Sequence, residues 1–169
     1  MRIRSLLTVL ALSALAIPVT AHAQGSAREG RGVDLGPQIL YGGDTDLGVG
    51  GRLIVNLESL PNWDFLASFN VWFPDDNGAD VSAWEGNANL AYNFLIEDVN
   101  SIFPYVGAGL NIFHVSVDTP GDGDFDDTDL GINLFGGTKF TAGSLTPFAE
   151  VRVVIEGSDQ VVLAFGLLF

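Results

Sequence analysis

The fold is decided by the last nine residues of the sequence, Val161-Val162-Leu163-Ala164-Phe165-Gly166-Leu167-Leu168-Phe169. Counted back from Phe169, every second residue is bulky and apolar, whereas the alternate positions carry smaller groups, among them Ala164 and Gly166. Side chains alternate across a β-strand, so this pattern predicts a strand with one wholly apolar face and one closely packed face. A soluble protein rarely leaves such a strand at the free end of its chain.

The same alternation recurs from Val33 onward. Apolar residues return at every second position, which indicates strands and not helices. Each stretch is about ten residues long, the length that a tilted membrane strand needs. With the terminal strand, the predicted strands are residues 33–41, 47–57, 63–73, 84–94, 104–112, 130–140, 149–155 and 161–169.

The two faces of these strands differ in composition. One face carries Leu, Val, Phe and Trp, and the opposite face carries Gly, Asn, Ser and a few charges. Glycine is too small to fill a soluble core, so the apolar face is expected to meet lipid. Backbone groups in lipid must all be paired, which requires a closed sheet in which residues 161–169 pair with residues 33–41. The prediction is an all-β protein, an eight-stranded antiparallel up-and-down transmembrane β-barrel.

The N-terminus has the composition of an export signal. Arg2 and Arg4 precede the apolar run 6–19, and small residues stand at Ala21 and Ala23. Residues 1–23 are therefore predicted to be a signal peptide for Sec-type export, residues 24–32 a polar lead-in, and residues 33–169 the barrel. The sequence holds no cysteine, which excludes a lipid-anchored cysteine and disulfides.

Charge excludes nucleic acid as a partner. Two of the seven Lys and Arg residues lie in the predicted leader, so the rest of the chain has five basic residues against 21 acidic ones. Phosphate binding needs clustered Lys and Arg. The connections predicted at residues 74–82 and 118–128 are the longest and are expected outside the cell, and both ends of the mature chain are expected in the periplasm. Aromatic residues near strand ends fit interfacial girdles: Tyr41, Trp63, Phe73, Trp84, Tyr92, Phe94, Phe103 and Phe140.

Several stretches resemble the small eight-stranded outer-membrane β-barrel family of the OmpA transmembrane-domain and OmpX type. They are PYVGAGL at residues 104–110, DLGINLFGG at 129–137, PFAEVR at 147–152 and the terminal Phe169. The resemblance covers residues 33–169. It implies a monomer in the outer membrane of a Gram-negative bacterium, surrounded by lipid and lipopolysaccharide and inserted by the barrel-assembly machinery. It also implies that Phe165, Leu167 and Phe169 form the assembly signal.

Charges within the strands are the first candidate site. An Arg or Lys that faces lipid at mid-depth would cost about 2–4 kcal/mol, so these residues are expected to point inward and to form pairs. The predicted lumen network is Arg52, Asp64, Glu85, Lys139, Glu150 and Arg152. In an eight-stranded barrel such residues are expected to plug the lumen, and the alternative is a narrow porin-like pore for ions or small polar solutes.

The acidic stretch 118–129 is the second candidate. It holds six carboxylates in twelve residues, of which Asp122, Asp124 and Asp126 could bind a loop-held Ca²⁺. The stretch does not match an EF-hand, and a solvated acidic loop is the alternative.

The predicted location in the outer membrane says more about function than any catalytic motif does. His114 and Ser116 share a strand face, but no third group that would orient them for nucleophilic catalysis is apparent, and no other catalytic or cofactor motif appears. The chain is therefore predicted not to be an enzyme. Its expected role is structural or in surface interactions, with a pore as the second possibility and a soluble exported barrel that binds an apolar ligand as the third.

Overall fold

The computed structural model describes residues 32–43, 45–74, 80–96, 101–119, 123–156 and 159–169. The predicted signal peptide and most of the lead-in lie outside the described residues, as does Asp122. No helix in the described part of the chain could cross a membrane.

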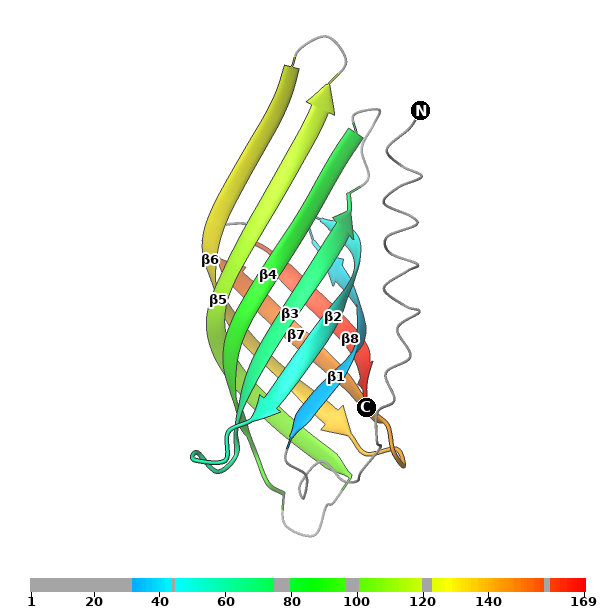
Figure 1. The fold of residues 1–169 in the computed structure, drawn as a ribbon, viewed down its shortest axis with the longest axis vertical. Helices are drawn as coiled ribbons and strands as arrows, with labels where there is room; N and C mark the ends of the chain where they lie inside the picture. The colour runs from blue at the N-terminus through cyan, green and yellow to red at the C-terminus, as the bar shows by residue number, and fades with distance from the viewer. Residues whose placement is uncertain (1–31, 44, 75–79, 97–100, 120–122, 157–158) are drawn as a thin grey trace.

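Eight antiparallel strands form one closed barrel in the order of the chain (Figure 1). They are β1 (Val33–Gly42), β2 (Asp46–Asn56), β3 (Trp63–Phe73), β4 (Asp80–Asn93), β5 (Ile102–Thr119), β6 (Gly123–Phe140), β7 (Thr146–Ile155) and β8 (Val161–Leu168). The sheet closes where β1 pairs with β8, with Ile39 opposite Phe165. The predicted barrel, its strand number and its closing pair are confirmed.

The predicted faces are also correct on every strand. Large apolar side chains point away from the barrel, and examples are Leu110 (67% exposed), Val151 (49%) and Phe165 (49%). Within the barrel, their neighbours along each strand point inward and are buried or half-buried. Phe103 is an exception among the predicted girdle aromatics, because it lies on the inward face of β5 and is only 7% exposed.

The barrel has two unlike ends. We call the end that holds the β1–β2, β3–β4, β5–β6 and β7–β8 connections the hairpin end, and it is uppermost in Figure 1. The other end holds the remaining three connections and Phe169, and we call it the terminal end. β5 and β6 are each 18 residues long and, together with β4, extend well beyond the other strands at the hairpin end.

The predicted loop at residues 118–128 is wrong, since most of it is strand. β5 and β6 stay paired up to Thr119 opposite Gly123. Val117 lies opposite Phe125, and such β-branched and aromatic pairs stabilise a two-stranded ladder. The acidic residues do not break this ladder because an exposed strand leaves their carboxylates in water: Asp126, Asp127 and Asp129 are all exposed. In the same way, β4 begins at Asp80, inside the predicted loop 74–82.

Inward glycines accommodate large side chains from neighbouring strands. A methyl group at Gly48 would lie 2.7 Å from the indole of Trp72, and one at Gly137 would lie 2.6 Å from the Tyr105 hydroxyl oxygen. Gly107 is covered in the same way by the ring of Phe135. Glycine therefore does not leave the lumen empty, because it provides the space in which an adjacent ring lies flat across the strand.

We expect Gly166→Ala to destabilise the barrel by about 1–3 kcal/mol, the usual cost of overpacking. An added Cβ would meet the ring of Phe148 and the carbonyl oxygen of Pro37. Gly51→Ala is the matched control, because Gly51 lies in β2 on the outward face and a Cβ there meets nothing within 4 Å. Urea unfolding of the two variants in lipid bilayers measures the difference. Equal stability of both variants would contradict this account of the interior glycines.

Candidate functional site in the lumen

All six charged residues predicted for the lumen lie inside the barrel. The side chains of Asp64, Glu85, Glu150, Arg52 and Arg152 are at most 4% exposed, and that of Lys139 is 12% exposed. They fall into two groups. Arg52, Glu85, Glu150 and Arg152 share one network, whereas Asp64 and Lys139 form a separate pair nearer the terminal end.

Two arginines and two glutamates form the core of the network. Arg52 donates to both carboxylate oxygens of Glu150, from Nη1 and Nη2, at 2.7 Å each. Arg152 donates from Nη2 to Glu150 at 3.3 Å and from Nη1 to Oε1 of Glu85 at 3.0 Å. Charges buried in this way are stable only with good geometry and several hydrogen bonds, which the bidentate pair provides.

Two amide side chains complete a closed ring. Gln38 accepts a hydrogen bond from Nε of Arg52 at 2.9 Å and donates to Asn70 at 2.5 Å. Asn70 in turn donates to Oε1 of Glu85 at 2.6 Å. Six side chains from β1, β2, β3, β4 and β7 therefore hydrogen-bond in an unbroken circuit, which we call the lumen ring: Gln38, Arg52, Asn70, Glu85, Glu150 and Arg152.

Gln38 and Asn70 were not predicted as site residues. A signal for them exists in the sequence, since both are polar residues at inward positions of alternating strands. Gly50 of β2 lies between them in the register, opposite each of the two. A Cβ at Gly50 would collide with the amide group of Asn70, so the missing side chain allows β1 and β3 to interact across β2.

Asparagines extend the ring toward β5 and β6. Asn111 donates to Glu85 at 3.2 Å and to Asn87 at 2.9 Å, and Asn133 donates to Asn87 at 2.8 Å and to Asn89 at 3.0 Å. All four are nearly fully buried. The hydrogen-bonded section thus reaches from β1 to β7.

Two apolar layers enclose the lumen ring along the barrel axis. The hairpin-side layer consists of Leu40, Trp72, Ala83, Phe113, Val162 and Ala164. The terminal-side layer consists of Ile54, Leu66, Ala91, Tyr105, Phe135, Phe148 and Leu168. The inward residues of β3 show the order, because Leu66 is followed by Asn70 and then by Trp72. Arg52 contacts the terminal-side layer directly, with its guanidinium 4.2 Å from the centre of the Phe148 ring.

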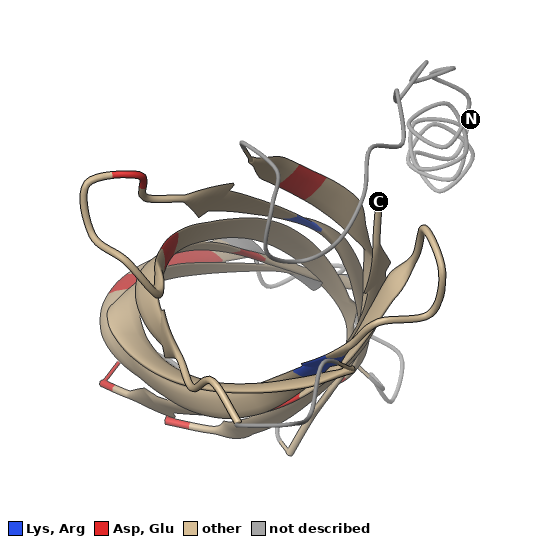
Figure 2. Cartoon of the chain, turned by 90° about the horizontal axis from the view of Figure 1, so that it is seen from below, with Lys and Arg blue, Asp and Glu red and all other residues tan. Residues whose placement is uncertain are grey.

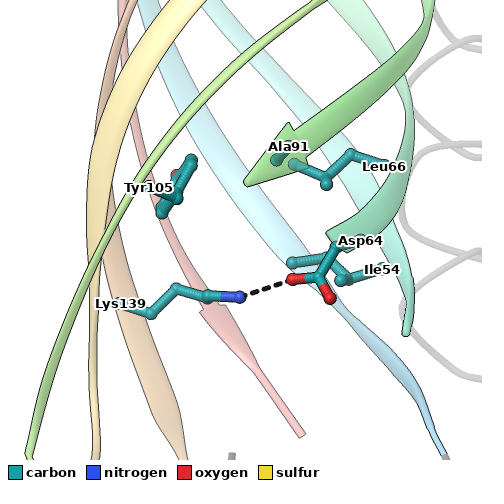
Figure 3. A pocket seen from close by; sticks show the side chains of 6 residues that line it. All are labelled: Ile54, Asp64, Leu66, Ala91, Tyr105 and Lys139. Atoms are coloured by element: carbon teal, nitrogen blue, oxygen red, sulfur yellow. Dashed lines mark hydrogen bonds and ion pairs between the residues drawn. The ribbon is translucent and has the colours of Figure 1, made fainter. Parts of the chain in front are cut away.

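The Lys139–Asp64 pair lies between the terminal-side layer and the terminal end (Figure 3). Nζ of Lys139 is 2.8 Å from Oδ2 of Asp64, whose carboxylate also accepts from Asn56 at 2.7 Å and from Asn93 at 2.8 Å. The hollow beside this pair has essentially no room for a free water molecule. The space beside this pair is therefore filled by side chains.

Positive charge in the described part of the chain is confined to the lumen. Its Lys and Arg residues are Arg52, Lys139 and Arg152, and each is paired with a carboxylate. In the view along the barrel axis, the corresponding segments lie on the closed wall (Figure 2). Three exposed carboxylates without such pairing lie on β6 at the hairpin end, those of Asp126, Asp127 and Asp129.

Two of the three residues predicted for calcium lie in a strand. Asp124 and Asp126 are in β6, opposite Asp118 and Ser116, and Asp122 lies outside the described residues. An extended strand cannot wrap an ion as a loop does. Within the described ranges no three His, Cys, Asp or Glu residues are grouped to hold a metal.

The residues predicted as an assembly signal lie at the outside of the closing strand. Phe165 and Phe169 are 49% and 44% exposed, and Leu167 is partly buried on the same face. The backbone of Phe169 exchanges hydrogen bonds of 3.0 and 3.2 Å with Leu35 of β1. These residues therefore lie on the outer side of the seam.

Solved structures share this fold. The N-terminal β-barrel domain of Pseudomonas aeruginosa OprF aligns with a TM-score of 0.64 and 17% identity, over 86% of this chain and all of that domain. Ail, the attachment invasion locus protein of Yersinia pestis, aligns with a TM-score of 0.58 and 14% identity, over 80% of this chain and 93% of Ail. Neisserial surface protein A aligns with a TM-score of 0.56 and 15% identity, over 80% of this chain and 92% of that protein. No protein-family model and no curated protein matches the chain.

We expect Glu150→Gln to destabilise the barrel by about 3–5 kcal/mol, because it leaves Arg52 and Arg152 buried without their shared carboxylate. Tyr105→Phe removes the 2.9 Å hydrogen bond that the hydroxyl donates to Glu150 and the 3.4 Å one that it accepts from Arg52, and should cost about 1 kcal/mol. Glu58→Gln in the exposed β2–β3 turn is the control and should change stability by less than about 0.5 kcal/mol.

Urea unfolding in lipid bilayers ranks these variants. A double variant, Glu150→Gln with Arg52→Gln, should be more stable than the sum of the two single effects predicts, because the unpaired charge of Arg52 is removed with its partner. Strict additivity would show that the two residues do not act as a unit.

Proposed function

We propose that the chain is an integral protein of the bacterial outer membrane, closed by its own side chains and acting in surface interactions through the sheet that it projects beyond the barrel. One observation carries the membrane part of this proposal. Exposed apolar side chains surround the closed barrel, as Ile39 (56%), Leu90 (46%) and Leu134 (47%) illustrate, while charged residues fill its interior. This distribution suits a barrel with lipid outside. The fold shared with OprF, Ail and Neisserial surface protein A supports the same location.

The interior supports a closed barrel more than a pore or a ligand cavity. An ion that crossed the lumen would have to displace the lumen ring and both apolar layers, and apolar constrictions exclude water and ions by dewetting. A soluble carrier of an apolar ligand would need an empty apolar cavity, whereas aromatic rings from neighbouring strands occupy the lumen. Discrete conductance steps of the purified protein in planar bilayers would contradict the closed state.

Orientation follows from the two ends. We place the terminal end in the periplasm, after export through the signal peptide predicted at residues 1–23, and the hairpin end outside the cell. The even number of strands and the long β5 and β6 at the hairpin end support this arrangement, since bacterial barrels have short periplasmic turns and longer extracellular extensions. A monomer in lipid and lipopolysaccharide, inserted by the barrel-assembly machinery through Phe165, Leu167 and Phe169, completes the proposal.

The projecting sheet is the surface through which we expect contacts. β4 pairs with β5 as far as Asp80 opposite Asp118, and β5 continues to pair with β6. β6 pairs with β7 only from Ile132 onward. Residues 123–131 of β6 therefore present one edge that has no β7 partner among the described residues. Such an edge can add a further strand. Phe125 is 61% exposed and Leu130 is 74% exposed beside this edge, which adds apolar contact area.

Charge restricts the partner. The sequence holds no Lys or Arg between Arg52 and Lys139, and this span includes the whole projecting sheet. A solved structure of Ail contains the heparin analogue sucrose octasulfate. Sulfate groups need cationic side chains, which this surface lacks. We therefore expect a cationic partner and no polyanion.

We retain the predictions that the chain is not an enzyme and holds no resident cofactor. Any Ca²⁺ bound through Asp122, Asp124 and Asp126 would be held weakly, because Asp124 and Asp126 lie in an extended strand. His114, the histidine of the described region, contacts Thr128 through Nδ1 at 2.8 Å. That contact is to a hydroxyl and provides no carboxylate to orient the ring for catalysis.

Fractionation of expressing cells should recover the protein in the outer membrane, from which detergent extracts it and alkaline carbonate does not. Alkaline carbonate should not release the protein, because the exposed apolar side chains around the barrel hold it in lipid. The folded barrel should also migrate differently from the heated protein on a gel. Recovery in the soluble periplasmic fraction without detergent would favour the soluble carrier instead.

The surface role can be tested with a cationic strand. We expect an extended peptide of alternating Lys and Val to bind the protein in nanodiscs, and Asp126→Lys with Asp127→Lys and Asp129→Lys to weaken this binding about tenfold or more, equivalent to about 1.4 kcal/mol. Glu58→Lys, at the terminal end, is the control and should leave binding unchanged. Fluorescence anisotropy of the labelled peptide measures both. Equal weakening by the control would indicate long-range attraction without a site.

A further inference from the structure

The outer face of β4, β5 and β6 changes from apolar to polar across three successive rows of residues. Trp84, His114 and Thr128 lie opposite one another in the middle row. The row on the barrel side is Gly86, Ile112 and Leu130, and the row on the hairpin side is Ser82, Ser116 and Asp126. The middle row therefore marks the place where lipid-facing surface becomes hydrogen-bonding surface.

Three rings form a strip along this boundary. Phe69 and Trp84 have centroids 5.7 Å apart and planes inclined by 27°, and Trp84 and His114 have centroids 5.3 Å apart and planes inclined by 30°. The hydrogen bond between Nδ1 of His114 and Oγ1 of Thr128 holds the last ring in place. Phe69 is 55% exposed, and Trp84 and His114 are partly exposed. The strip is thus accessible and ordered.

The aromatic cluster at the terminal end is arranged differently. Trp63 meets Tyr92 at 65° and Tyr92 meets Phe94 at 83°, so these rings pack edge to face against each other. The adjoining residue in the register is Val106, which adds no polar group. Ordinary interfacial packing accounts for this cluster. The near-parallel rings and the hydroxyl and carboxylate row at the hairpin end need a different explanation.

We propose that the strip of Phe69, Trp84 and His114, with the polar row of Ser82, Ser116 and Asp126, binds the uncharged sugar headgroup of an outer-leaflet glycolipid. A sugar ring presents C–H bonds on its faces, and their partial positive charge is attracted to the negative faces of aromatic rings. Its hydroxyl groups can donate to a carboxylate and exchange hydrogen bonds with serine. The site offers both kinds of contact side by side.

Two observations select a lipid headgroup as the source of the sugar. The site is continuous with the lipid-facing surface, because Ile112 and Leu130 lie directly beside it on the barrel side and Leu130 is 74% exposed. An acyl chain bound there would hold its headgroup against the strip. The carboxylate of Asp126 and the lack of Lys or Arg between Arg52 and Lys139 favour neutral sugar over phosphate. The proposal uses the outward orientation of the hairpin end, but the binding itself can be measured without it.

The test can be made by NMR, because each of the three tryptophans of the sequence gives its own indole N–H signal in one spectrum. Trp84 reports the proposed site, Trp63 reports the terminal-end cluster, and Trp72, buried in the hairpin-side layer, reports the folded barrel. Protein in dodecylphosphocholine micelles is titrated with dodecyl maltoside, whose chain is matched and whose headgroup is an uncharged disaccharide. We expect the Trp84 indole N–H and the His114 ring signals to shift saturably, while the Trp63 and Trp72 signals stay.

Variants separate the contacts. Trp84→Leu keeps an apolar side chain toward lipid and should abolish the His114 shift, whereas Trp63→Leu should leave it unchanged. Ser82→Ala with Ser116→Ala, both at exposed or partly exposed positions, should weaken binding about fivefold through lost hydrogen bonds. The Trp72 signal verifies that each variant is folded, and the serine variant carries the test if Trp84→Leu fails to fold.

Three outcomes would overturn the proposal. Equal shifts at Trp63 and Trp84 would reflect a change in the micelle, and unchanged spectra would exclude binding. An equal response to free maltose at the same concentration would assign the site to a soluble sugar and not to a glycolipid. None of these results depends on membrane location or on the cationic partner, so failure here is distinct from failure of the proposed function.

Discussion

The lumen ring of Gln38, Arg52, Asn70, Glu85, Glu150 and Arg152 is the interaction on which the rest of the structure depends. Its members come from five strands, and each is held only when those strands lie in one register. A slip of one residue along β2 would turn Arg52 from the lumen to the apolar outer face, at a cost of about 2–4 kcal/mol if that face meets lipid, and would leave Glu150 without its bidentate partner. Buried charge therefore contributes specificity of register, whatever its net contribution to stability.

The apolar layers and the glycines follow from the same requirement. Hydrogen bonds between charged groups are stronger in apolar surroundings, and the lumen ring lies between two layers of buried apolar side chains. A narrow barrel has space for aromatic rings in those layers only where the wall has no side chain of its own. Gly48 beneath Trp72 and Gly166 against Phe148 provide that space. Wall glycines and lumen aromatics are thus one packing arrangement, distributed over adjacent strands.

Alternation with a period of two made the fold predictable from the sequence. It set the strand number, the faces and the inward position of all six charged residues, because inside and outside differ sharply in polarity around a closed sheet. It did not reveal which inward residues meet across the lumen. Asp64 and Glu85 both lie inward, yet they belong to different groups, since that depends on strand tilt and register. Gln38 and Asn70 were missed because they carry no charge. A buried charge requires a partner of opposite sign, which directs the search along the sequence, and an uncharged amide does not.

The error at residues 118–128 has a related cause. Acidic residues and glycines were interpreted as a loop, yet Val115, Val117 and Phe125 continue the strand alternation through the same segment. Acidic composition indicates that side chains are solvated, and it does not prevent the backbone from pairing as a strand. The hairpin of β5 and β6 does both where it projects beyond the barrel. The segregation of charge then follows from one rule: cations are retained where a carboxylate can neutralise them inside the barrel, and unpaired carboxylates remain where water surrounds them. The hairpin end is consequently anionic, and its recognition must rely on cations, sugar hydroxyls or backbone pairing.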